Sequence, residues 1–188
     1  MTLSGLDTIP ALILVDLQKQ ILASGHAELR SVIRNATALA EAFRAAGLPV
    51  VLVNVAGSAP GRTDASAGRA TPRERPDGWM EIAPELGMHP DDILITKMRW
   101  GAFHSTSLDR ELRSRGVTQV MIGGVATSMG VESTARAAHE HGYNVVLLTD
   151  AMLDPDRASH DHTISRVFPK LGETTSTTEL LNELSSRR

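Results

Sequence analysis

The chain of 188 residues contains no cysteine. Disulfide bonds, thiolate metal sites and cysteine nucleophiles are therefore excluded. An excess of charge is also absent, since the formal net charge is −3 and the charged residues are scattered, so we expect neither a nucleic-acid nor a membrane partner. The first apolar run stops at Asp16, too early for a secretory signal or a membrane span. These absences predict a cytoplasmic protein.

Apolar residues are present in short, dense runs. They make up 41% of the chain, which suits one globular domain with a sizeable core. Strands that are buried on both faces read as continuous rather than alternating apolar runs, as in a parallel sheet covered by helices. We therefore expect a single α/β domain over residues 1–188. The runs are ALILVD (11–16), VVLVNV (50–55), DILIT (92–96), VMIGG (120–124) and VVLLTD (145–150).

Helical patterns separate several of these runs. Three of them end at a glycine, a residue that takes the left-handed conformation of a helix end at little cost: Gly47, Gly116 and Gly142. The segment 56–80 has no periodicity and is rich in Gly, Pro, Ala and Arg. Loops of this length are usually functional or disordered, which leaves two interpretations, a surface excursion and a lid. Its arginines have two interpretations, solvated charge, which is the commoner, and contact with a carboxylate of a substrate or partner; they are Arg62, Arg69, Arg73 and Arg75.

Polar residues stand where the predicted strands end. Asp16, Asn54, Lys97 and Asp150 each lie at the end of an apolar run or just past it, and residues 125–130 follow another. Open α/β sheets bind their ligands outside the carboxyl ends of the strands, where the strand order reverses. We therefore expect a site at this edge of the sheet.

The turn after Gly124 allows two interpretations from its own residues. The pattern A-x-S-x-G at 126–130 approximates the G-x-S-x-G nucleophile turn of α/β-hydrolases, with Ser128 as the nucleophile. The competing interpretation, which we favour, makes Ser128 the N-cap of a helix that starts near Met129. The partners that a serine nucleophile requires follow in the order Asp, His: Asp150, then His160 or His162.

Three segments together resemble the isochorismatase-like (cysteine hydrolase) superfamily. They are ALILVDLQKQI, ITKMRWGAFHSTSLDREL and GVATSMGVESTARAAHEHGYNVVLLTDAM. The likeness extends from about residue 10 to about residue 175. It implies a three-layer α/β/α sandwich with a mostly parallel six-stranded sheet and a pocket at the strand carboxyl ends. It also implies a small-molecule substrate and a homo-oligomer, a dimer or larger.

The resemblance also implies the catalytic positions. In the amidase branches an Asp, a Lys and a Cys act on a carbonyl, and these fall at Asp16, Lys97 and Gly130, because the pattern T-x-x-C-V-E-S-T reads TSMGVEST here. Without a thiolate no acyl-enzyme forms at that position. Isochorismatases proper resemble the chain in having Gly there, and they hydrolyse a vinyl ether. We expect a hydrolase in which Asp16 donates a proton and Lys97 positions the substrate. The alternatives are a serine hydrolase and a catalytically silent binding or scaffold protein.

Further site features come from the same resemblance. It implies a cis peptide bond between Val125 and Ala126. The Asp-x-His…His zinc pattern of nicotinamidases is missing from NVAGSAPGRTD at 54–64, so we expect no metal and no other cofactor. The implied substrate-binding residues are Gln18, Arg99, Trp100, Phe103, Val125, Ala126 and Thr127.

Overall fold

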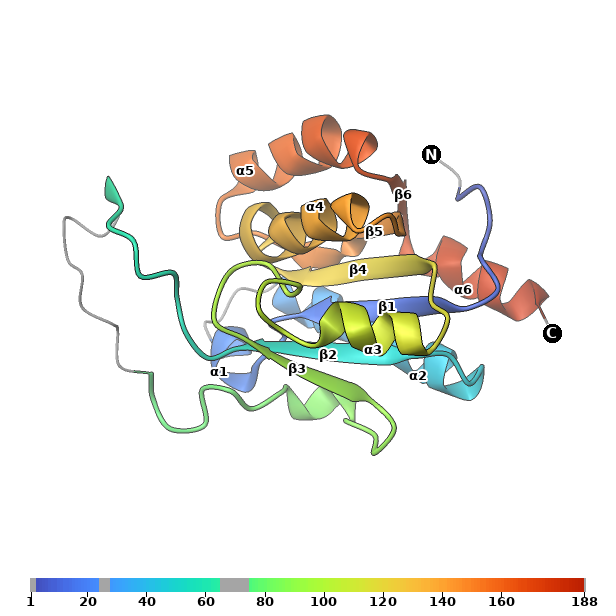
Figure 1. Cartoon of the computed structure of the whole chain (residues 1–188), viewed down its shortest axis with the longest axis horizontal. Helices are drawn as coiled ribbons and strands as arrows, with labels where there is room; N and C mark the ends of the chain where they lie inside the picture. Colours follow the sequence, from blue (N-terminus) through green and yellow to red (C-terminus); the bar gives the residue numbers. More distant parts are fainter. Residues whose placement is uncertain (1–2, 24–27, 65–74, 188) are drawn as a thin grey trace.

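The computed structural model describes residues 3–23, 28–64 and 75–187. Six parallel strands form one sheet in the order β3-β2-β1-β4-β5-β6 (Figure 1), which confirms the predicted six-stranded α/β sheet. The five apolar runs supply β1 to β5, whereas β6 is short and only partly buried, so no apolar run marks it. The strands are β1 (Pro10–Val15), β2 (Val50–Val55), β3 (Ile93–Lys97), β4 (Gln119–Val125), β5 (Asn144–Leu153) and β6 (Glu173–Thr175).

Helices cover both faces of the sheet and make three layers (Figure 1). One face packs against α2 (Leu29–Ala45) and α6 (Thr177–Ser186). The other packs against α3 (Leu108–Ser114) and α4 (Glu132–Glu140), with α5 (Arg157–His162) following β5. The remaining helical segments are α1 (Lys19–Leu22), η2 (Pro84–Leu86), the π-type turn η3 (Thr127–Val131), η4 (Thr163–Val167) and η5 (Phe168–Lys170).

The helix boundaries follow the local sequence. In α2 the buried apolar residues recur every three or four positions, so one face of the helix meets the sheet. The helix α6 starts at a reciprocal capping pair, in which Ser176 and Glu179 bond each other's backbone N–H groups. The three predicted glycine ends are confirmed, with φ of 67°, 71° and 82° at Gly47, Gly116 and Gly142.

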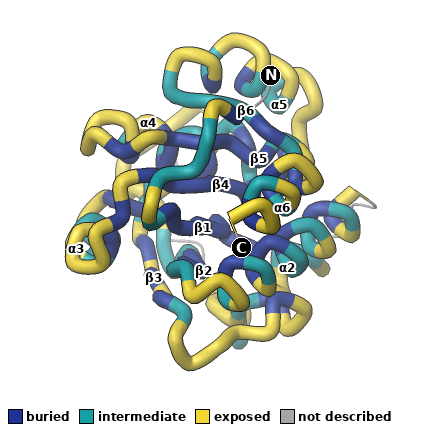
Figure 2. Tube along the Cα trace, turned by 90° about the vertical axis from the view of Figure 1, so that its right-hand side faces the viewer, coloured by how far each residue is buried: buried dark blue, intermediate teal, exposed yellow. Residues whose placement is uncertain are grey.

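Burial is greatest in the middle of the sheet (Figure 2). Every residue of β1 and β4 is buried, as the continuous apolar runs predict. The same prediction is wrong for β3, in which buried and exposed residues alternate and Leu94 is 49% exposed. The reason is that β3 is the edge strand, while α2 packs on β1, β2, β4 and β5. One face of β3 therefore lacks a covering helix.

The C-terminal end of the loop 56–80 is hydrogen-bonded to β2. The Trp79 indole N–H donates to the Val55 carbonyl at 2.6 Å, and the Asn54 amide donates to the Met80 carbonyl at 2.8 Å. Arg75 lies 4.3 Å from the centre of the Trp79 ring. The predicted lid arginines Arg69 and Arg73 lie outside the described residues. Within the described ranges, no helix is long and apolar enough to cross a membrane.

Candidate active site

The strand order reverses between β1 and β4, which places the predicted ligand crevice where these two strands end. Asp16 directly follows β1, and its φ of 54° is in the left-handed region that residues other than glycine seldom adopt. Backbone outliers of this kind cluster at functional sites. Beside it, β4 leads through Ala126 into η3, and the peptide bond between Val125 and Ala126 is cis, at the position that the resemblance implied.

Asp16 and Lys97 form a buried ion pair at the carboxyl ends of β1 and β3. Lys97 Nζ lies 2.7 Å from Asp16 Oδ2, and the two side chains are 2% and 8% exposed. The ammonium also donates to the Arg99 carbonyl at 3.2 Å. Asp16 Oδ1 is buried and accepts no hydrogen bond from the described residues. Because an unpaired buried acceptor costs free energy, a proton or a ligand donor on Oδ1 stabilises the site.

Asp16 keeps its proton to a higher pH than an ordinary aspartic acid does. Burial raises the pKa of Asp16 to about 6, and the charge and hydrogen bond of Lys97 oppose this rise without cancelling it. Desolvation therefore dominates the ion pair here. A carboxyl group with a pKa of about 6 is matched to general acid–base work near neutral pH.

Gly130 lies directly opposite this carboxyl group. A Cβ atom at position 130 would be 3.2 Å from Asp16 Oδ2, 3.1 Å from Val15 Cγ1 and 3.2 Å from the Val125 carbonyl oxygen. A side chain here would therefore point at the carboxyl group and crowd it. Glycine avoids this crowding, and the three predicted catalytic positions lie together.

Gln18 lies next to the site but bonds to backbone. Its amide oxygen accepts from the Val55 N–H at 2.7 Å, and its amide nitrogen donates to the Trp79 carbonyl. These two bonds tie the end of the loop 56–80 to β2. Arg99 is half-buried and donates to the Ser58 and Met98 carbonyls, at 3.3 and 3.0 Å. Trp100 is 58% exposed.

Phe103 is the predicted pocket residue that the structure does not bring to the Asp16–Lys97 pair. Its ring stacks on His141 at 5.1 Å between centroids and packs on Tyr143 at 5.9 Å. Both partners follow the C-terminal end of α4, whereas the site lies before its N-terminal end. Phe103 is 8% exposed and belongs to the core.

The turn that carries Gly130 is held by side chains from the β5–α5 segment. Thr127 is fully buried, and its hydroxyl lies 2.9 Å from His160 Nδ1. The Ala126 carbonyl accepts from the Met129 and Val131 N–H groups, at 3.1 and 3.2 Å, which starts the helical turn. Val125, the last residue of β4, is buried in the core on the α2 side of the sheet.

Ser128 does not cap the helix, so that prediction is wrong. The turn begins at Thr127, with Ala126 rather than Ser128 in the cap position. Instead the Ser128 hydroxyl and N–H both donate to Asp154 Oδ2, at 2.6 and 2.8 Å. Asp154 lies 26 residues away, just past the end of β5. The only sequence signal for it is its position after a strand, where ligand-binding residues are expected.

The serine triad is not assembled either. Asp150 accepts from the Thr177 N–H and hydroxyl, at 2.8 and 2.9 Å, and so caps α6. His160 bonds Thr127 rather than Ser128, and the Ser128 hydroxyl bonds Asp154 rather than His162. In the described part of the chain, no group of three or more His, Asp or Glu side chains converges in a way that holds a metal ion.

We expect Ser128→Ala to lower the free energy of unfolding by about 1–3 kcal/mol, because it removes a hydrogen bond to a buried carboxylate. Urea unfolding measures this, with Ser185→Ala, whose hydroxyl bonds only a helix carbonyl on the surface, as the control. A fluorophosphonate probe should leave the protein unlabelled. Stoichiometric labelling at Ser128 would contradict the structural role.

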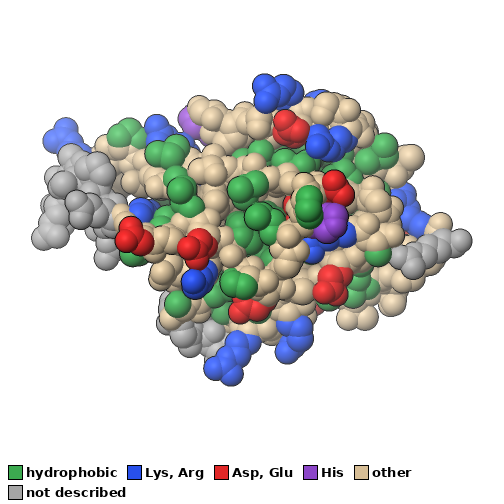
Figure 3. Space-filling model, turned by 90° about the horizontal axis from the view of Figure 1, so that it is seen from below, with side chains coloured by type: hydrophobic (Ala, Val, Ile, Leu, Met, Phe, Trp, Pro, Cys, Tyr) green, Lys and Arg blue, Asp and Glu red, His purple; other side chains and the backbone are tan. Residues whose placement is uncertain are grey.

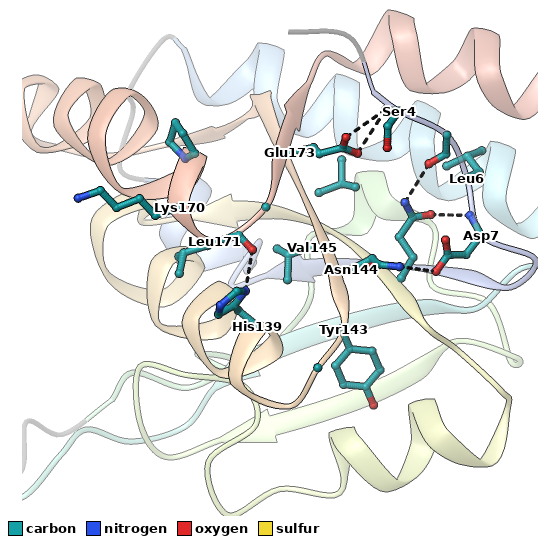
Figure 4. Close-up of a pocket in the computed structure, with 16 residues that line it drawn as sticks. Ser4, Leu6, Asp7, His139, Tyr143, Asn144, Val145, Lys170, Leu171 and Glu173 are labelled. Atoms are coloured by element: carbon teal, nitrogen blue, oxygen red, sulfur yellow. Dashed lines mark hydrogen bonds between the residues drawn. The ribbon is translucent and has the colours of Figure 1, made fainter.

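A separate cavity of about 770 Å³ opens at the amino ends of β4 and β5 (Figure 4). Its polar groups satisfy one another: Asn144 Nδ2 donates to Asp7 Oδ2 at 3.0 Å, and the Ser4 N–H donates to the Glu173 carboxylate at 3.2 Å. Lys170 extends away from these groups (Figure 4). The buried unpartnered oxygens of the described chain, on Asp16 and Asn54, lie elsewhere. The candidate site is therefore the one marked by these oxygens and not this cavity.

Comparison with known proteins matches residues 10–179 to the Isochorismatase domain. The uncharacterized isochorismatase family protein YwoC of Bacillus subtilis is 37% identical over 179 residues, 93% of each chain. The ureidoacrylate amidohydrolase RutB of Pseudomonas syringae is 32% identical over 75% of this chain and 69% of its own. An isochorismatase family protein from Burkholderia thailandensis has a similar structure, with a TM-score of 0.88 and 35% identity over 96% of this chain and 98% of its own.

Proposed function

The chain belongs to the isochorismatase family of hydrolases, and from this premise we propose that it hydrolyses a small enol ether through proton donation by Asp16, with no covalent enzyme intermediate. The Oδ1 oxygen of Asp16, which has no hydrogen-bond partner among the described residues, carries the proposal. It is buried and belongs to a carboxyl group with a pKa of about 6. At pH 7 about one tenth of such groups hold a proton, which is sufficient for a general acid.

The reaction needs few protein groups. Asp16 transfers its proton to the terminal carbon of the enol ether, forming a C–H bond and leaving an oxocarbenium ion. Water adds to this ion and returns a proton to the Asp16 carboxylate. The hemiketal then breaks its C–O bond, releasing a ketone product and an alcohol. The sum consumes one water molecule and regenerates the acid.

Lys97 and the first turn of the helix have separate parts in this scheme. The ammonium holds Asp16 Oδ2 at 2.7 Å, so Oδ1 is the oxygen that carries the proton. It also stabilises the carboxylate that remains after transfer. The helix that begins at Thr127 binds the Asp154 carboxylate through the Ser128 N–H at its positive N-terminal end, which holds the turn beside Asp16. Gly130 keeps side-chain atoms off the carboxyl group, because a Cβ there would lie 3.2 Å from Asp16 Oδ2.

An amide substrate fits these residues less well. RutB is an amidohydrolase by name, and an acyl-enzyme route to amide cleavage needs a nucleophilic side chain. The chain has no cysteine, and the Ser128 hydroxyl donates to Asp154. These two facts favour ether over amide hydrolysis.

A substrate screen tests this proposal. Isochorismate and other enol ethers are compared with nicotinamide and N-carbamoyl compounds. We expect turnover of enol ethers alone, slower in D₂O than in H₂O because protonation limits the rate. Hydrolysis of the amides by the unmodified protein would contradict the proposal. Tight binding without turnover of any compound would favour the scaffold alternative.

The pH profile gives a second test. We expect kcat/KM to fall as the pH rises through about 6, because Asp16 then loses the proton that it donates. Lys97→Met removes the charge and hydrogen bond that lower the pKa of Asp16, so the falling limb should move to higher pH. Lys19→Met, at an exposed lysine paired with Glu81, is the matched control. An unmoved limb in Lys97→Met would show that Asp16 is not the titrating acid.

A further inference from the structure

The strand β2 extends beyond its neighbour β1. The last paired residues of these two strands are Val15 and Val53, whereas β2 continues to Val55. At the end of β1 the Asp16 N–H still donates to the Val53 carbonyl at 2.8 Å, but the Asp16 carbonyl accepts from the Gln18 N–H, also at 2.8 Å. The backbone groups of Val55 on the side of β1 therefore have no partner in that strand.

Two side chains bond Val55 where β1 does not reach it. The Val55 N–H donates to the Gln18 amide oxygen at 2.7 Å, and the Val55 carbonyl accepts from the Trp79 indole N–H at 2.6 Å. The Gln18 amide nitrogen donates to the Trp79 carbonyl, so the three residues form a closed triangle of hydrogen bonds. Gln18 is fully buried. Because a backbone group that is removed from water without a partner costs free energy, these bonds stabilise the end of β2.

The end of β2 determines where Lys97 lies. Among the described strands, β3 pairs with β2 alone. Val55 is the ladder partner of Lys97, and the Ala56 N–H donates to the Lys97 carbonyl at 2.9 Å. Figure 3 views the molecule from the side of β3 and shows hydrophobic side chains at the middle of the face with charged ones around them, as expected of an edge strand without a covering helix. The backbone of Lys97 is therefore held in place through β2.

We propose that Gln18 and Trp79 are positioning residues for the Asp16–Lys97 pair. They hold the end of β2, and through it they keep Lys97 Nζ at 2.7 Å from Asp16 Oδ2. The resemblance implied a substrate contact for Gln18, but both polar ends of its side chain bond backbone groups. The inference rests on the proposed function for the use of the pair in catalysis, whereas the placement of the pair can be measured without a substrate.

Titration of the Asp16 carboxyl carbon by NMR tests the proposal on the full chain. Gln18→Met keeps the length of the side chain and removes both of its bonds, and Trp79→Phe removes the indole N–H. Among the described residues, Lys97 is the charged group that acts on Asp16, and it lowers the pKa of Asp16. When Lys97 is displaced, the midpoint should move to higher pH by about half a pH unit or more, part of the roughly 1–3 by which a close opposite charge lowers a carboxyl pKa. Trp79→Phe should move it less, in the same direction, and decides the matter if Gln18→Met does not fold.

Gln119→Met is the matched control. Gln119 is also buried, and its amide bonds the Asp7 N–H at 2.9 Å and the Gly5 carbonyl at 3.0 Å at the start of β4. This variant should lose stability in the same way but leave the midpoint of the Asp16 titration unchanged.

The direction of the change separates positioning from general loosening. An unchanged midpoint in the folded variants, or an equal rise in Gln119→Met, would overturn the proposal. A fall towards the ordinary value of 3.8 would also overturn it, because it would mean that water reaches the carboxyl group while Lys97 stays in place. If an enol ether is turned over, the falling limb of kcat/KM should move with the NMR midpoint. If none is, the proposed function fails and the NMR titration still decides the role of Gln18 and Trp79.

Discussion

Asp16→Asn is expected to lower kcat for an enol ether by at least about 10²-fold, the lower range of general-acid contributions. Asn keeps the shape of the side chain but has no acidic proton to transfer. Because substrate contacts change little, KM should change much less than kcat. Steady-state kinetics on the substrate identified by the screen measures both.

Asp150→Asn is the matched control for this variant. That carboxylate also ends an apolar run of the sequence, but it lies within β5 and its contacts are to Thr177 at the start of α6, so kcat should stay near that of the unmodified protein. Asp16→Asn leaves the Lys97 ammonium without its anion, so urea unfolding must show that both variants are folded under assay conditions. Full activity of folded Asp16→Asn would end the general-acid mechanism.

Gly130→Val is expected to lower turnover roughly 10²-fold, because its side chain would crowd and displace the Asp16 carboxyl group. The Cβ alone would already lie 3.1–3.2 Å from three neighbours, and overpacking of this kind costs about 1–3 kcal/mol of stability. Steady-state kinetics and urea unfolding measure the two effects.

Gly61→Val is the control for Gly130→Val, since a Cβ at Gly61 meets nothing within 4 Å. It adds the same side chain and should leave kcat/KM unchanged. If Gly130→Val is folded and fully active, the placement of the Asp16 carboxyl group does not limit turnover, and the proposed geometry is wrong.

Much of the fold could be predicted because it depends on local patterns. Buried central strands read as unbroken apolar runs, and glycines mark helix ends. The exposure of Leu94 could not be read in the same way, because it depends on which strand lies at the edge and where α2 packs. Sequence order alone does not give sheet order, and DILIT looks like the runs of the sheet centre.

The site was predictable only in its outline. The rule that ligands bind past strand ends identified Asp16 and Lys97, since each ends or follows an apolar run. The support of the turn was not predictable, because the bonds from Asp154 to Ser128 and from His160 to Thr127 join residues 26 and 33 positions apart. Phe103 shows that a residue within a matching motif need not lie at the site. Its motif neighbours lie near the crevice, while its own ring turns into the core.

The buried carboxyl group couples folding to proton uptake. In the unfolded chain Asp16 has its ordinary pKa of 3.8, whereas in the folded chain its pKa is about 6, so between these values unfolding releases a proton to solvent. The stability that this group contributes is fully present below pH 3.8 and is lost as the pH rises through 6. Near neutral pH the buried Asp16 carboxylate is charged, and its desolvation lowers the free energy of unfolding. The same pKa of Asp16 therefore determines both the acid strength proposed for catalysis and the pH dependence of unfolding.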